Sequence, residues 1–471
     1  MKNLSTSSLH LDNEFYSNFF RISIPIAMQS FMAASLNLVD NIMVGQLGDA
    51  SIAGVGLANQ FFFILNLILL GVNGASAIFL SQFWGSRNIS NIKKILGLSL
   101  ILAISSAMLF FLVGYLFPEK VLAVFSKDPE VIASGSSFLR IISFSYILMA
   151  VSSCYATALR TTERVTVPMI TSIAALIINT VLNYMLIFGK FGFPALGVAG
   201  SATATLIARV IEVIILLVFV YAKNEIVAAK IKELFDIPIS LVKRFMTTSS
   251  AVIFKDVIWA VGMTVYMIVY ARIGTEAAAS INIVNTIRQL AFVLFVGVGN
   301  ACLIMVGNQI GADSPHTAYR YAKKFLKIAV GLGIITGSLV ILLRSVVLSP
   351  YNVSQEVIQG ANNILLIFGF AIVLDVFNMV SVVGIMRSGG DINFCIIMDT
   401  IAVWLIGLPL AIISGMVLHL QVHWVFAAVT LQELFKFILC FKRVVSRKWI
   451  NNLVHDINNE PVKTESTIPV S

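Results

Sequence analysis

The sequence predicts an all-α polytopic membrane protein with twelve transmembrane helices in two parallel six-helix repeats. Three observations lead to this fold class: the composition, the long apolar runs and a repeat at about half the chain length. Of the 471 residues, 58% are hydrophobic and only 12% are charged, whereas soluble domains have roughly 45–50% apolar and about 25% charged residues. With a mean hydropathy of +0.93, the chain lacks the charges that a water-exposed surface requires.

Twelve apolar runs are long enough to cross a bilayer, which takes about 20 residues in a helix. In the first half they are residues 19–44, 52–81, 95–116, 135–157, 168–189 and 197–221. In the second half they are residues 247–271, 277–306, 325–347, 358–386, 393–415 and 422–441. Each run is continuous rather than alternating every second residue, so we expect helices and not the strands of a membrane barrel.

The second half of the chain repeats the first at an offset of 226–227 residues. The matched pairs include Asn59 and Asn285, Gly85 and Gly311, Arg160 and Arg387, and Thr203 and Thr430. Six helices in each half give both halves the same orientation, as in transporters built from parallel repeats. We therefore divide the chain into a first six-helix half (1–221), a cytoplasmic linker (222–246), a second half (247–442) and a tail (443–471) that we expect to be disordered.

The net charge of +9 comes from basic residues that lie mainly on one side of the predicted membrane. Of 32 Lys and Arg residues, 22 fall in the two termini and in alternate loops, and only five fall in the opposite loops. Basic residues collect in cytoplasmic loops. We therefore expect both termini in the cytoplasm of a multi-pass cell-membrane protein, and we expect no nucleic-acid partner.

Three carboxylates, Asp40, Asp256 and Asp375, lie well inside the apolar runs. An ionisable group in the bilayer core costs at least a few kcal/mol, so such a residue faces the interior and is a functional candidate. A structural carboxylate, hydrogen-bonded to a neighbouring helix, is the alternative for each. For Asp399, near a predicted cytoplasmic end, we favour that structural role.

Side-chain amides recur near these acids and between them they offer oxygen ligands. The candidates are Asn37, Asn179, Asn183 and Asn378. Hydrogen bonds between helices explain many such residues in membranes. Oxygen atoms of amides and carboxylates also suit a hard cation, and we place a Na⁺ site at Asp256 and Asp375.

The chain has no nucleotide-binding G-x-x-x-x-G-K-[ST] motif. Transport work would then come from an ion gradient, with membrane carboxylates as the sites of H⁺ or Na⁺ and with no cofactor. The same carboxylates can exchange such an ion for a cationic substrate, which is antiport chemistry.

Three tracts resemble the multidrug and toxic compound extrusion (MATE) transporters of the NorM type. They are VDNIMVGQLGDASIAGVGLANQ (39–60), LNYMLIFGKFGFPALGVAGSATAT (182–205) and GIMRSGGD (384–391). The resemblance extends from about residue 17 to 445. It implies a V-shaped antiporter, not an enzyme, that exports organic cations and drugs in exchange for H⁺ or Na⁺ by alternating access. It also implies ion-coupling roles for Asp40, Asp256 and Asp375.

Two departures from the family pattern affect the site. Asn183 stands four residues after Asn179, where the DinF-type branch has an acid, which favours the NorM type. Lys255 precedes Asp256, and a lysine facing the cavity would act as an internal cation that weakens Na⁺ binding.

Two other functions compete with drug export. A flippase for lipid-linked saccharides needs basic cavity residues, yet the interior acids outnumber Lys255 and Arg288. A membrane-embedded transferase needs clustered acids for Mg²⁺, whereas the acids here are dispersed. We therefore expect a transporter that functions as a monomer in the lipid bilayer, with small cationic molecules as its substrates.

Overall fold

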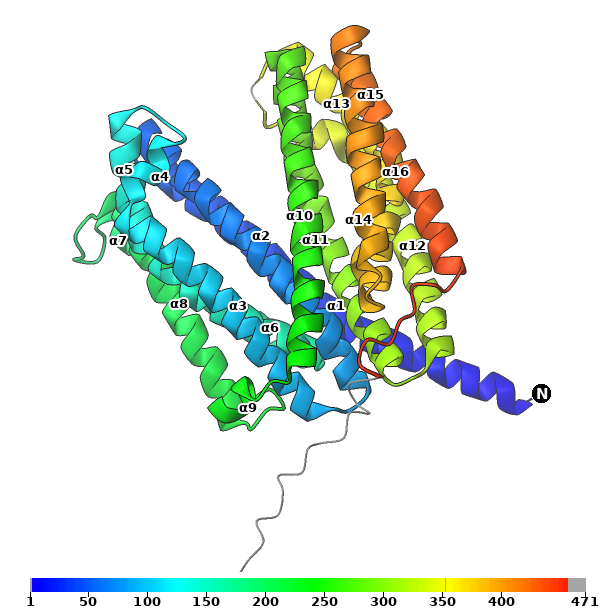
Figure 1. Cartoon of the computed structure of the whole chain (residues 1–471). Coiled ribbons are helices and arrows are strands. Elements are labelled where there is room, and N and C mark those ends of the chain that lie inside the picture. The colour runs from blue at the N-terminus through cyan, green and yellow to red at the C-terminus, as the bar shows by residue number, and fades with distance from the viewer. Residues whose placement is uncertain (1, 352, 456–471) are drawn as a thin grey trace, which may run out of the picture.

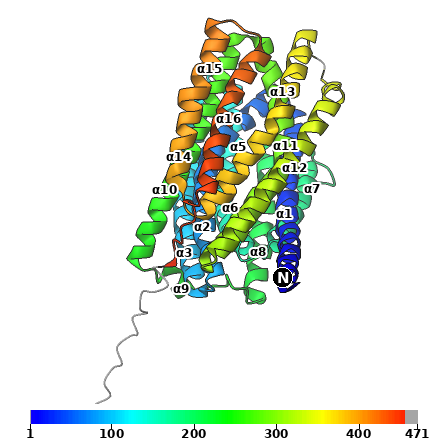
Figure 2. The same ribbon diagram turned by 90° about the vertical axis from the view of Figure 1, so that its right-hand side faces the viewer.

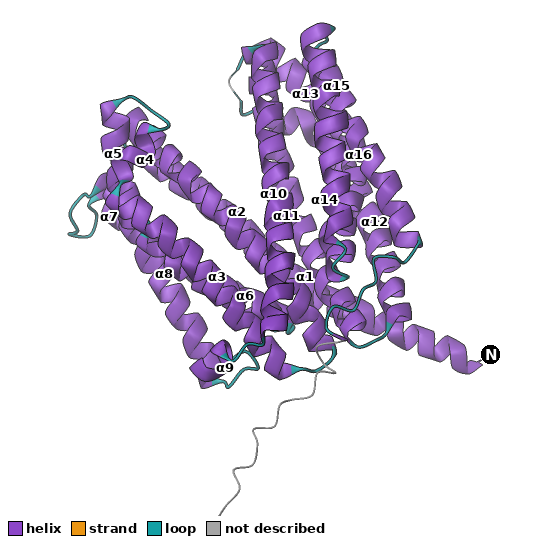
Figure 3. Ribbon diagram, viewed as in Figure 1, coloured by secondary structure: helices purple, strands orange, loops and turns teal. Residues whose placement is uncertain are grey.

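The computed structural model describes residues 2–351 and 353–455, without the side chains of residues 2–12, 37 and 38. Helices joined by short loops form two groups that lean apart (Figures 1 and 3), and no strand occurs in the described residues. Eleven helices are long and apolar enough to cross a membrane, and a pair bent by 47° makes a twelfth span. The twelve-helix fold predicted from the apolar runs is therefore confirmed.

The first half of the chain contributes six spans. They are α1 (Lys2–Gly45), α2 (Asp49–Gly85), α3 (Ile89–Leu116), the bent pair α5 (Pro129–Ile142) and α6 (Phe144–Thr161), α7 (Thr166–Phe188) and α8 (Gly197–Ala222). A short helix, α4 (Pro118–Ala123), precedes α5. The linker carries another short helix, α9 (Ile231–Phe235).

The second half contributes the other six spans. They are α10 (Ile239–Ile273), α11 (Thr275–Gly311), α12 (Pro315–Leu348), α13 (Gln355–Met379) with its continuation η1 (Val380–Met386), a composite span, and α16 (Val422–Val445). The composite span runs through α14 (Ile392–Thr400), η2 (Ile401–Gly407), α15 (Leu408–Ile412) and η3 (Ile413–Val417). The η segments are π-helical, and two of them flank α15, where Pro409 has no backbone N–H to donate. Helix α10 begins eight residues before the predicted boundary at 247.

The two halves exchange the starts of their first helices. Phe15 and Phe19 of α1 pack with the core of the second half, where Phe325 of α12 contacts both rings. Phe245 of α10 packs in turn with the core of the first half, against Phe79 of α2. Phe19 and Phe245 are 226 residues apart, so the exchange follows the sequence repeat. It anchors each half to the other at one end of the molecule.

At that same end, α2 and α11 cross with their backbones in contact. A Cβ added at Gly85 would overlap the carbonyl of Asn308, and one added at Gly311 would overlap the carbonyl of Gln82. Both the glycines and their contacts are related by the 226-residue offset. Glycine is required here because a side chain at either position would push the two helices apart.

The two halves diverge away from this crossing, so the molecule is V-shaped (Figure 1). The N-terminal end of α1, the linker helix α9 and the C-terminal segment all lie toward the closed end of the V (Figures 1 and 2). Large apolar side chains cover the outer faces of the spans: Val218, Leu342, Phe370 and Leu405 are each at least 60% exposed. Such surfaces are stable against lipid and not against water.

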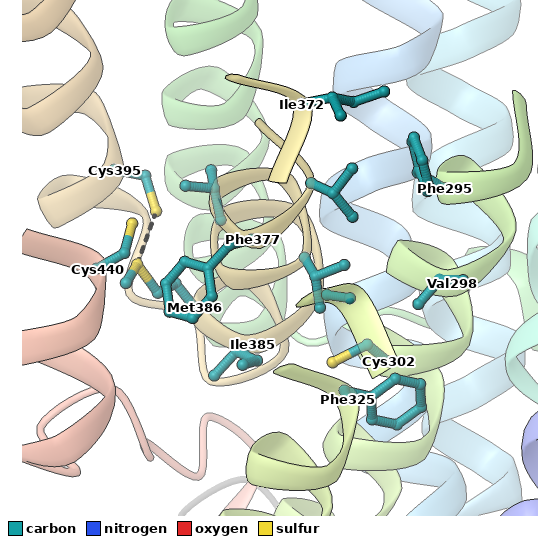
Figure 4. Packing of buried hydrophobic residues seen from close by; sticks show 14 of the residues in the cluster. Phe295, Val298, Cys302, Phe325, Ile372, Phe377, Ile385, Met386, Cys395 and Cys440 are labelled. Carbon is teal, nitrogen blue, oxygen red and sulfur yellow. Dashed lines mark hydrogen bonds between the residues drawn. The ribbon is translucent and has the colours of Figure 1, made fainter. Parts of the chain in front are cut away.

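The core of the second half is apolar and contains sulfur. Cys302, Cys395 and Cys440 are buried, and the thiol of Cys395 lies 3.7 Å from the sulfur of Met386 (Figure 4). Cys154 is buried in the first half. All four cysteines are therefore structural residues of the two cores.

The prediction of a disordered tail is wrong for residues 443–455. Helix α16 extends to Val445, and beyond it the side chains of Trp449 and Val454 are fully buried. The backbone N–H of Leu453 donates to Gln82 of α2 at 2.8 Å, and Asn452 donates to Asp313 after α11 at 2.7 Å. This segment, residues 446–455, joins both halves at the closed end. Residues 456–471 lie outside the described residues.

Candidate functional site

Asp40 of α1 faces two amide side chains of α7 in the first half. Asn183 donates from Nδ2 to Oδ1 of Asp40 at 2.5 Å, and also to the side-chain oxygen of Asn179 at 3.0 Å. Asn179 and Asn183 are one helical turn apart and are both at most 1% exposed. When the Asn179 amide is turned over, its nitrogen donates to Asp40 at 3.1 Å and its oxygen accepts from Thr205 of α8. The three predicted residues therefore form one site.

A cavity of about 190 Å³ extends from Asn179 and Thr205 between α1, α6, α7 and α8. Its polar wall is a chain of hydrogen bonds in which Gln29 donates to Ser172 at 2.8 Å and Ser172 donates to Glu212 at 3.2 Å. Arg209 completes the chain with an ion pair to Glu212 at 2.6 Å. The i,i+3 pairing of Arg209 with Glu212 neutralises both charges inside the first half.

A larger cavity, of about 390 Å³, lies in the second half and is closed on one side by Leu67 and Leu70 of α2. Eight charged residues line it, four acids and four bases: Asp256, Asp375, Asp399, Glu433, Lys255, Arg288, Arg387 and Lys436. If all are ionised, their charges cancel. With all eight groups ionised, this cavity, which we call the C-half cavity, is polar but carries no net charge.

Most of these charges form one continuous chain of ion pairs. Arg387 and Lys255 both contact Oδ1 of Asp256, at 3.3 and 3.1 Å. Lys255 also reaches Asp399 at 3.4 Å, and Lys436 joins Asp399 at 3.6 Å to Glu433 at 3.0 Å. The last member, Glu433, accepts from Asn378 of α13 at 3.0 Å.

A separate pair, Arg288 of α11 and Asp375 of α13, lies in the same cavity. The guanidinium is 3.0 Å from Oδ2 of Asp375 and stacks over the ring of Phe292, 5.3 Å from its centroid. The partner that the sequence left open for Asp375 is thus a side chain from another helix.

The sequence and the architecture match those of a known protein family. The MatE family model matches residues 25–185 and 251–413, which together are more than half of the chain and which begin 226 residues apart. The chain belongs to the MATE transporter family. A Bacillus subtilis (strain 168) relative, the uncharacterized transporter YisQ, is 26% identical over 92% of this chain and 95% of its own.

Two further relatives have the same extent. The probable multidrug resistance protein NorM of Bacillus cereus (strain ATCC 10987 / NRS 248) is 26% identical, over 90% of this chain and 91% of that protein. The structure of a mutant of the Vibrio cholerae MATE transporter VcmN superposes with a TM-score of 0.84 at 17% identity, over 94% of this chain and 99% of that one. This MATE protein is therefore a multi-pass membrane transporter and not an enzyme.

In this MATE transporter the predicted site residues fall into two groups. Asp40, Asn179 and Asn183 lie together in the first half, and Asp256, Asp375 and Asn378 line the C-half cavity. The side chain of Asn37 lies outside the described residues. The predicted residues thus form two sites, one in each half, rather than a single one.

Four further residues of the C-half cavity are outside the predicted site: Arg387, Asp399, Glu433 and Lys436. Arg387 and its repeat counterpart Arg160 were assigned to cytoplasmic loops, but each lines the cavity of its own half. Removing both from the loop count leaves the excess of basic residues on the same side. The repeat could have predicted this position, because two arginines matched at an offset of 227 residues are expected to have the same role in their two halves.

The predicted Na⁺ site at Asp256 and Asp375 does not fit the contacts of these acids. Each carboxylate already has a side-chain cation within 3.3 Å. Among the described side chains, no three His, Cys, Asp or Glu residues come together as ligands. A Na⁺ ion that displaced Arg288 from Asp375 or Arg387 from Asp256 would leave a guanidinium group unpaired, which is costly in a low-dielectric site.

Proposed function

We propose that this chain is a multidrug exporter that exchanges organic cations and drugs for H⁺ or Na⁺ by alternating access across the cell membrane. The multidrug resistance protein of Bacillus cereus supports drug export as the function of this chain as well. The bias of basic residues in the loops supports a cytoplasmic location for the closed end of the V. The V is then open to the outside.

One observation carries the ion-exchange part of the proposal. Within the described side chains, Asp40 has no Lys, Arg or His nitrogen within 4.0 Å, whereas Asp256, Asp375 and Asp399 each have one or two. A change of charge at Asp40 therefore leaves no cation unpaired. For this reason we place the exchanged ion at Asp40 and favour H⁺.

The hydrogen bonds of Asn183 support a proton at this position. Its Nδ2 donates to the carboxylate of Asp40, while its Oδ1 is buried and has no hydrogen-bond partner among the described atoms. A protonated carboxyl group is a donor, and it would pair with that oxygen after a rotation of the amide. The same side chain can thus satisfy both protonation states.

The charges of the C-half cavity remove one argument against the flippase alternative but add none in its favour. Four bases balance the four acids of the C-half cavity, so an excess of acids cannot be used against a pyrophosphate-bearing substrate. Drug export remains favoured because relatives that match most of the chain are named probable multidrug resistance proteins.

Reconstituted vesicles with separately imposed pH and Na⁺ gradients test the proposal. Efflux is followed for ethidium, a permanent cation, and for rhodamine 110, a dye with an amine-derived cation and a carboxylate. We expect a pH gradient to drive efflux and Asp40→Asn to abolish it. Asp49→Asn, at an exposed position in the first turn of α2, is the matched control. Efflux by Asp40→Asn at the wild-type rate, or no response of the wild type to either gradient, would contradict antiport at this site.

A further inference from the structure

The charged groups that a ligand can reach in the C-half cavity carry both signs. The side chain of Arg288 is 30% exposed and that of Arg387 is 14% exposed, whereas Asp375 and Asp399 are 5% and 9% exposed. Among the four acids, Asp256 is the most accessible, at 19%. Glu433, at 12%, is almost as exposed as Arg387, so the accessible charges are two positive and two negative groups.

A charged ligand can bind most readily at the Arg387–Asp256 ion pair. Its atoms are 3.3 Å apart and both side chains are partly exposed to the cavity. Asp256 also retains Lys255 at 3.1 Å, so it stays compensated when Arg387 moves away. For Arg387, in contrast, no other acid lies within 4.0 Å among the described side chains.

Charge balance then decides which ligands fit. A simple cation that took Asp256 would leave the guanidinium of Arg387 unpaired. A simple anion that took Arg387 would give the otherwise balanced cavity a net negative charge. A ligand with both charges can insert into the pair: its carboxylate takes Arg387 and its ammonium takes Asp256. Every charge then keeps a partner of opposite sign, so no buried charge is left uncompensated.

The rest of the cavity suits an aromatic body between these charges. Trp259, Met263, Phe292 and Met379 are part of its lining, and its volume of about 390 Å³ is within the range of drug-binding pockets, roughly 300–1,000 Å³. The side-chain oxygen of Asn378 is buried in the same wall and has no hydrogen-bond donor among the described atoms. It is a ready acceptor for the N–H groups of an ammonium.

We propose that the C-half cavity binds amphoteric aromatic molecules, which carry a carboxylate and a protonated amine, in preference to molecules with a positive charge alone. This substrate class rests on the proposed function as a drug exporter. It assigns Arg387 as the group that recognises the carboxylate, and Asp256 and Asn378 as those that recognise the ammonium.

Two rhodamine dyes that differ in one group provide the test. Rhodamine 123 is the methyl ester of rhodamine 110, so it keeps the cationic ring system and lacks the carboxylate. Binding to the purified full chain is measured by fluorescence anisotropy, with no gradient present. We expect rhodamine 110 to bind about tenfold more tightly, the factor typical of one hydrogen bond to a charged group. Equal binding of the two dyes, or tighter binding of rhodamine 123, overturns the proposal.

Variants locate the preference. Arg387→Met is expected to bind the two dyes equally, while Arg387→Lys keeps part of the preference and Arg272→Met, at an exposed position at the end of α10, keeps all of it. The double variant Arg387→Met/Asp256→Asn removes one group of each sign and so covers the case in which the single variant does not fold. It too should lose the preference, and a preference retained in both variants overturns the assignment.

The outcomes separate this proposal from the antiport mechanism. A preference for rhodamine 110 without any gradient-driven efflux would contradict antiport and support the substrate class. Gradient-driven efflux of ethidium and rhodamine 123, with no preference for rhodamine 110, would contradict the substrate class alone.

Discussion

The crossing of α2 and α11 predicts that a single methyl group at Gly85 will open the closed end of the transporter. The added Cβ of Gly85→Ala would lie 2.8 Å from the carbonyl carbon of Asn308 and 3.0 Å from the amide nitrogen of Ala312. These atoms belong to the backbone of α11 and its end, so they cannot rotate out of the way. Ordinary Cβ contacts begin at 3.4 Å, and the carbonyl oxygen of Asn308 would be closer still than these two atoms. The helices must therefore separate locally by about 1 Å or more.

The energetic cost sets the size of the expected effect. Overpacking at a tight contact costs about 1–3 kcal/mol, and this penalty applies only in the state in which the crossing is closed. The equilibrium between closed and open should then shift by about 5- to 150-fold toward the open state. Gly311→Ala should have the same effect, because its contact with Gln82 is the repeat-related counterpart.

Thiol labelling measures this shift directly. Ser388, after η1, is fully buried beside the crossing, and the four native cysteines are buried as well. In a Ser388→Cys background in lipid nanodiscs, Gly85→Ala should raise the rate of maleimide labelling by that roughly 5- to 150-fold factor. Gly56→Ala is the matched control, because it lies on the same helix with no atom within 4 Å of the new methyl group. Labelling of Gly85→Ala at the wild-type rate, or equal acceleration by Gly56→Ala, would refute the reasoning.

Three further predictions concern the charge network, the C-terminal segment and the coupling ion. Lys255→Met leaves one negative charge in the C-half cavity without compensation, so we expect it to lower the free energy of unfolding by about 3–5 kcal/mol, measured by thermal unfolding in detergent. Lys255→Met/Asp256→Asn should recover part of the loss, and no recovery would argue against the pairing. Trp449→Ala removes a fully buried side chain of residues 446–455 and should cost about 3–5 kcal/mol, whereas the neighbouring exposed variant Lys448→Ala should unfold at the wild-type temperature. A Na⁺ gradient alone should drive no dye efflux in the wild type, because the acids of the C-half cavity already have internal cations; Na⁺-driven efflux that is lost in Asp256→Asn would contradict this expectation.

The parts of the fold that depend on local sequence could be predicted. Run length indicated the spans, because a bilayer imposes a minimum length on an apolar helix. The offset of 226–227 residues identified the two halves, since glycines at a helix crossing tolerate no substitute. Asp40, Asn179 and Asn183 could be selected because an acid and two amides in apolar runs need partners from other helices.

The ion pairs of the C-half cavity could not be predicted in the same way. Arg288 and Asp375 lie on different helices, 87 residues apart, and their contact depends on how those helices are rotated. Arg387 follows η1, where an apolar run ends at its first charge, so its position read as a loop. The buried tail was also missed, because two apolar residues, Trp449 and Val454, hold a segment that is otherwise polar.

The repeat shows how one fold came to carry two different sites. The positions related by the offset are Gln29 and Lys255, Ser172 and Asp399, Asp40 and Tyr266, and Thr205 and Gln432. Where the first half has a neutral hydrogen bond between Gln29 and Ser172, at 2.8 Å, the second half has an ion pair, at 3.4 Å. Where the first half has Asp40 among amides, the second has Tyr266, whose hydroxyl donates to Gln432 at 2.8 Å.

Under the proposed function, this difference in chemistry assigns ion exchange and ligand binding to different halves. The proposed proton site must tolerate a change of net charge, and Asp40 can do so because no side-chain cation lies within 4.0 Å of it among the described residues. A cavity that admits ligands among eight fixed charges must instead keep its net charge constant, and the paired network does so as long as the ligand carries both signs. Helix α2 takes part in the α2–α11 crossing and also lines the C-half cavity with Leu67 and Leu70. A movement of α2 at the crossing is therefore expected to alter access to the C-half cavity.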